Sequence, residues 1–125
     1  MAQKLSGEQV RRIEQIQEFQ KVVNHVKRLV GELDSNRAAK PKIIQNISAS
    51  IARELSQMRQ RSLAANIGQL ADVAGALGVL AARVGNLGFK IRGLNEGIVS
   101  MNLQLDQFLK AAQTPDQKGG DEPTS

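Results

Sequence analysis

Apolar residues recur at intervals of three and four along most of the chain, and this spacing is typical of amphipathic α-helices. The first such segment follows Ser6, which forms with Gln9 the Ser-x-x-Gln pattern of a capping box. Its apolar positions are Ile13, Ile16, Phe19, Val23, Val26, Val30 and Leu33. The pattern predicts a helix over about 8–34.

A second amphipathic segment begins at Pro41, a residue that suits the first turn of a helix because the amide proton it lacks would have no partner there. Its apolar positions are Ile44, Ile47, Ile51, Leu55 and Met58. They predict a helix over 41–61. After residue 112 the chain combines Pro, Gly and charged residues with no apolar side chain, so we expect 113–125 to be a disordered tail.

The rest of the chain follows a heptad pattern. Counting by sevens from Leu63, the two core positions of each heptad are occupied by Leu63, Asn66, Leu70, Val73, Leu77, Leu80, Val84, Leu87, Ile91, Leu94, Ile98, Met101, Leu105 and Phe108. All are apolar except Asn66. Such a seam is typical of a long helix packed like a coiled coil, and it predicts one helix over 63–112. The phase changes across 59–66, which predicts a stutter or hinge there.

Small residues surround this seam between 70 and 88, where Ala and Gly leave the helix apolar on nearly all sides. A helix that is apolar all round is buried all round, so we expect a central helix with several neighbours from this chain or from partner subunits. However, each glycine inside a helix costs up to about 1 kcal/mol relative to alanine. A turn at 85–88 is therefore the alternative, and it would give an up-down-up-down four-helix bundle with helices near 8–34, 41–61, 63–85 and 89–112. Either way the fold class is all-α, a helical bundle in a single domain over 1–112.

Positive charge is concentrated in one part of this 125-residue chain, whose net charge is +5. Within 35–62, Glu54 is the only acidic residue. The basic residues of this segment are Arg37, Lys40, Lys42, Arg53, Arg59 and Arg61. Such a cluster attracts phosphate on nucleic acid or on an anionic membrane surface, although it is also compatible with an ordinary solvated helix face.

Catalytic chemistry finds little support in the residue inventory. The chain has no cysteine and one histidine, so thiol nucleophiles, cysteine-based zinc sites and clusters of histidine ligands lack their residues. We expect a protein that is not an enzyme, with no cofactor, metal or small-molecule substrate. The first residues lack an apolar signal segment, and charges interrupt the longest apolar run, so we expect a cytoplasmic location.

His25 allows one chemical alternative. Lys21 lies one turn before it and Arg28 three residues after it, an arrangement that resembles the phosphorylated helix of histidine phosphotransfer domains. Arg28 and Leu29 stand where that family has lysine and glycine. The resemblance implies that His25 accepts a phosphoryl group beside Arg28. We favour the simpler interpretation, a solvated surface histidine.

The seam leads to the functional hypothesis. We expect an oligomerising scaffold or adaptor that associates through 63–109 with copies of itself or with partner helices. Binding of an anionic partner through 35–62 and phosphotransfer through His25 are the alternatives.

Overall fold

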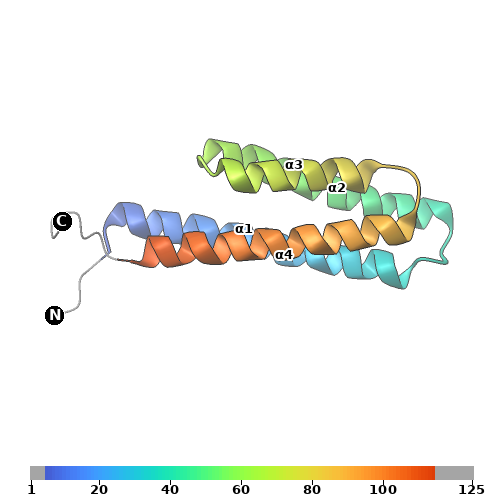
Figure 1. Ribbon diagram of the computed structural model, residues 1–125, viewed down its shortest axis with the longest axis horizontal. Helices are drawn as coiled ribbons and strands as arrows, with labels where there is room; N and C mark the ends of the chain where they lie inside the picture. The colour runs from blue at the N-terminus through green and yellow to red at the C-terminus, as the bar shows by residue number, and fades with distance from the viewer. Residues whose placement is uncertain (1–4, 115–125) are drawn as a thin grey trace.

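The computed structural model describes residues 5–114, and in this part of the chain every regular element is an α-helix. The four helices are α1 (Gly7–Ser35), α2 (Pro41–Ala64), α3 (Gly68–Ala82) and α4 (Leu87–Gln113). They form an antiparallel bundle in which α1 and α4 lie side by side and the α2–α3 hairpin covers them (Figure 1). Each helix packs against its neighbours in the chain, and α4 packs against α1. The all-α helical bundle expected from the sequence is confirmed.

The first two helices follow the predicted boundaries closely. Ser6 caps α1 as expected: its hydroxyl accepts a hydrogen bond from the Gln9 amide at 3.0 Å, while its own amide donates to the Gln9 side chain at 2.8 Å. The Gln9 side chain also donates to the carbonyl of Thr114, so the start of α1 is tied to the end of α4. Pro41 occupies the first turn of α2, which continues three residues beyond the predicted 61.

The prediction of one helix over 63–112 is wrong, because the chain breaks twice. The first break is at Asn66, which has φ 61° and therefore a left-handed backbone. The Ile67 amide donates to the Ser62 carbonyl and the Asn66 amide to the Leu63 carbonyl, the hydrogen bonds of a Schellman motif that ends α2. The predicted stutter or hinge over 59–66 therefore falls at the end of a helix.

The second break is the connection Arg83–Asn86. Gly85 has φ 145°, a conformation that side chains disfavour, and Asn86 then caps α4 by accepting a hydrogen bond from the Phe89 amide at 2.9 Å. The four-helix alternative is thus the observed topology. Of the predicted tail, Gln113 ends α4 and Thr114 caps it; residues 115–125 lie outside the described part.

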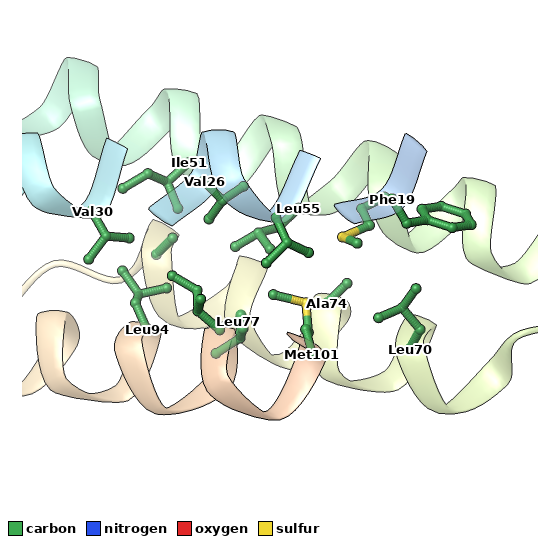
Figure 2. Close-up of a cluster of buried hydrophobic side chains, with 14 of the residues drawn as sticks. Phe19, Val26, Val30, Ile51, Leu55, Leu70, Ala74, Leu77, Leu94 and Met101 are labelled. Atoms are coloured by element: carbon green, nitrogen blue, oxygen red, sulfur yellow. The ribbon is translucent and has the colours of Figure 1, made fainter. Parts of the chain in front are cut away.

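An aliphatic core joins all four helices. Val26 of α1, Leu55 of α2, Leu77 of α3 and Met101 of α4 gather in one buried cluster, and Phe19 of α1 lies at the end of this cluster near Leu70 (Figure 2). Val26, Leu55 and Met101 have no exposed surface, and their burial is the main stabilising contribution to such a fold. No helix within residues 5–114 has the length and apolar character required to cross a membrane.

Glycine and alanine allow α3 to pack closely against both of its neighbours. Gly78 faces α2, where a Cβ would lie 3.7 Å from that of Leu55. On the other side, the Leu77 side chain fills the space that a Cβ on Gly97 of α4 would occupy, and Leu80 does the same at Gly93. The small residues of this region therefore serve contacts within one chain.

Candidate anion-binding groove

A groove lies where α3 is too short to cover its neighbours. α3 has 15 residues, whereas α2 has 24 and α4 has 27. Because α3 starts immediately after α2 and runs antiparallel to it, α3 covers the later part of α2 and ends before the first turns of α2 (Figure 1). We call the covered part the closed half of the bundle and the uncovered part the open half.

The groove of the open half has a volume of about 980 Å³, against about 730 Å³ for the hollow between α2 and α3 in the closed half. Its walls come from the first half of α2, the end of α3 and the start of α4. The apolar lining residues are Pro41, Ile44, Ala49, Ala52, Ala81, Ala82, Val84 and Leu87. An apolar hollow of this size with a few polar groups is typical of a binding site.

Four cationic side chains line the groove: Arg37, Arg53, Arg83 and Lys90. No aspartate or glutamate is among the lining residues. Arg37 pairs with Asp34 and reaches the first turn of α4, where its Nη1 lies 3.4 Å from the position of a Cβ on Gly88. The other three cations form no salt bridge within residues 5–114. The groove is therefore strongly positive.

Lys90 is the most deeply placed of these cations. Only 7% of its surface is exposed, and desolvation by burial lowers the pKa of its ammonium group. A cation without a paired carboxylate is costly at such a position. An anion in the groove would remove this cost, since opposite charges nearby favour the charged form of lysine.

Ser48 supplies a second buried polar group. It is also 7% exposed, and its Oγ has no hydrogen-bond partner, which is uncommon for a buried hydroxyl. A serine nucleophile activated by lysine requires a hydrogen bond between the two side chains. Ser48 Oγ has no such bond to Lys90, and both residues are polar members of the groove lining.

The structure distributes the six basic residues of 35–62 over several surfaces. Arg37 and Arg53 line the groove. Lys40 and Lys42 are exposed at the start of α2 and do not line the groove. Two residues point elsewhere: the Arg59 side chain packs beside Gly75 of α3, and Arg61 lies toward α1 near Gln15, Glu18 and Phe19.

Arg83 and Lys90 belong to the groove but were not among the predicted anion-binding residues. With Asp72, they are the charges that interrupt the apolar stretch after Leu70, and this interruption was the one feature of the sequence that marked them. Their position became clear only with the turn at Arg83–Asn86, which brings the end of α3 and the start of α4 to α2.

Most residues of the predicted oligomer seam lie in the core of the single chain. Buried members are Leu70, Leu77, Ile91, Leu94, Ile98, Met101 and Leu105; partly buried members are Val73, Leu80, Leu87 and Phe108. Three members are exposed: Leu63 at 48%, Val84 at 97% and Asn66 in its turn. The regular seam therefore reflects packing of α3 and α4 within the bundle.

His25 lies on α1, away from the groove. It is half-buried, Arg28 is exposed, and Lys21 is paired with Glu18 at 3.1 Å.

Within residues 5–114, no group of three histidine, cysteine or acidic side chains is placed to hold a metal ion. Compared with known proteins, the chain matches no family model, no curated protein and no solved structure.

Proposed function

We propose that this protein is a non-enzymatic binding module that takes up an apolar anionic partner in the groove of the open half. The observation that carries this proposal is the combination of apolar walls with four cations and no carboxylate in the lining. The apolar walls favour binding by burying surface, and the cations select negative charge and raise the association rate.

A fluorescent apolar anion, 8-anilinonaphthalene-1-sulfonate, provides a direct test. We expect it to bind with a dissociation constant that rises with salt, since salt screens the exposed arginines. Nuclear magnetic resonance should locate the largest amide shifts at Ser48, Ala82 and Lys90. Binding that is insensitive to salt, or shifts that centre on another surface, would refute the proposal.

A matched pair of variants separates the groove from general positive charge. Arg53→Gln with Arg83→Gln removes two groove cations, whereas Arg59→Gln with Arg61→Gln removes two cations from other surfaces of the same bundle. We expect the first variant to bind the probe about tenfold more weakly and the second to bind as the wild type does. Equal effects of the two variants would show that only the net charge matters.

Self-association is a second candidate, and it now rests on different residues from the predicted seam. Phe89, Val99 and Leu103 lie on one side of α4 and are 62%, 68% and 59% exposed. Exposed Arg92 and Glu96 lie on the same side between Phe89 and Val99, so Val99 and Leu103 form the main apolar patch, and exposed apolar patches occur at protein interfaces. We expect light scattering at high micromolar concentration to detect a dimer that the substitution Val99→Glu dissociates; a monomeric wild type would exclude this candidate.

A further inference from the structure

We propose that the groove receives a short acidic amphipathic helix of a partner protein, which packs against the first half of α2 beside the connection from α3 to α4. This inference rests on the proposed function and specifies the partner that the groove selects.

The first argument is length. α3 is nine residues shorter than α2, as the helix lengths of 15 and 24 residues show. At about 1.5 Å of rise per residue, the uncovered part of α2 extends for roughly 13 Å. This is two and a half turns of helix, and the connection from α3 to α4, which leaves the end of α3 here, forms one border of the uncovered part (Figure 1). A helix of about nine residues therefore matches the uncovered part of α2 in length.

The second argument is the shape of the walls. In the closed half, glycines of α3 allow the close approach to α2, with Gly78 facing Leu55, whereas in the groove α2 itself presents the small residues Ala49 and Ala52. Ile44 of α2 and Leu87 of α4 border the groove and are only partly buried. Helices pack at interaxial distances of about 8–10 Å when such residues lie at the contact. An apolar face with residues at intervals of three and four suits these walls.

The third argument is charge. Arg53 and Arg83 are exposed and have no carboxylate partner within residues 5–114, and Lys90 is buried without one. Glutamates beside the apolar stripe of a bound helix would reach these cations. The hydroxyl of Ser48, which lacks a partner, would gain one as well. An acidic helix thus satisfies both the unpaired charges and the unpaired hydroxyl.

The experiment uses the full-length protein and a fluorescein-labelled peptide of about 14 residues, with leucines at intervals of three and four and glutamates on the flanking positions. Isolated helices of this length are marginal in water, so the free peptide should be largely unfolded. We expect it to bind by fluorescence anisotropy and to become helical by circular dichroism. A peptide of the same composition with a central proline should bind at least about tenfold more weakly, because proline disrupts the helix.

Charge-reversal variants test the location. Arg53→Glu with Arg83→Glu should weaken peptide binding by at least about tenfold, because like charges repel across the contact. Arg59→Glu with Arg61→Glu makes the same change in net charge outside the groove and should leave binding within about threefold of wild type. All four arginines are exposed, so both variants should keep the helicity of the wild type.

The outcomes distinguish the inference from the proposed function. If the anilinonaphthalene probe binds in the groove while the acidic peptide does not, the partner is a small apolar anion and the helix proposal is wrong. Equal binding of the proline peptide would also overturn it. If neither ligand binds, the proposed function fails together with the inference. Equal weakening by both charge-reversal variants would refute the location in the groove.

Discussion

The closed and open halves of the bundle share the same α2 helix but differ in what covers it. In the closed half, Leu55 is fully buried and faces Gly78 of α3. In the open half, Ile44 borders the groove and is only partly buried. The difference follows from the length of α3, which ends at Ala82. One short helix thus covers the later part of α2 and leaves a basic apolar groove over its first part.

Truncation of apolar residues on α2 should show the largest difference between the halves. We expect Leu55→Ala to lower the free energy of unfolding by about 2–5 kcal/mol, because it leaves a cavity in the closed core. Ile44→Ala should cost about 1 kcal/mol, since its side chain is partly solvated before the change. Urea denaturation followed by circular dichroism measures both. If Ile44→Ala and Leu55→Ala lower the free energy of unfolding by similar amounts, Ile44 is as well covered as Leu55 and the groove is closed in solution.

Two glycine substitutions test how α3 is held. Gly97→Ala should destabilise the protein by about 1–3 kcal/mol, because the new methyl group would overlap the Leu77 side chain. Gly78→Ala meets only ordinary contacts with Leu55 and the Ala52 carbonyl, at 3.7 and 3.9 Å. It should therefore stabilise α3 by up to about 1 kcal/mol through its higher helix propensity. Thermal unfolding compares the two variants, and the same sign for both would contradict this packing of α3.

The two connections of α3 should respond differently to substitution. Asn66→Leu places a branched side chain at a left-handed position and should cost about 1–2 kcal/mol. Val84→Ser, in the connection to α4, should change stability by less than about 0.5 kcal/mol, because Val84 is 97% exposed. Denaturant midpoints provide the measurement. Stabilisation by Asn66→Leu would instead support a continuous helix through residue 66.

The smallest expected effect concerns Lys90. Burial lowers the pKa of Lys90 below 10.5 in the folded protein, so near and above the lowered pKa the folded state binds fewer protons than the unfolded chain. The resulting penalty is fully present at neutral pH and disappears as pH rises through 10.5. Lys90→Met should therefore be more stable than wild type at pH 7, by about 1 kcal/mol or less.

The measurement for Lys90 is the difference in the free energy of unfolding between variant and wild type as a function of pH. The advantage of Lys90→Met should shrink toward pH 11, whereas the exposed Lys42→Met should show no such trend. A constant difference across this range would indicate that Lys90 is solvated in solution.

Several features could be read from the sequence because they depend on neighbours in the chain. The spacing of Ile16, Phe19, Val23 and Val26 predicted α1 and its buried face, and Ser6 with Gln9 predicted its start. Pro41 likewise marked the start of α2. Capping and amphipathic periodicity act within one or two helical turns, so a single sequence reveals them.

The extent of α3 and the groove were decided by tertiary structure. The heptad phase continues across Gly85, because helices in an antiparallel bundle present the same kind of apolar stripe as one continuous helix does. Asn66 and Gly85 are residue types that favour helix ends and turns, and both have positive φ, but the heptad pattern alone favoured a continuous helix. Likewise, Arg53, Arg83 and Lys90 are distant in sequence, and only the chain reversals at Asn66 and Gly85 bring them to one groove. Long-range packing determines which cations lie together, and the periodicity of the sequence does not predict that packing.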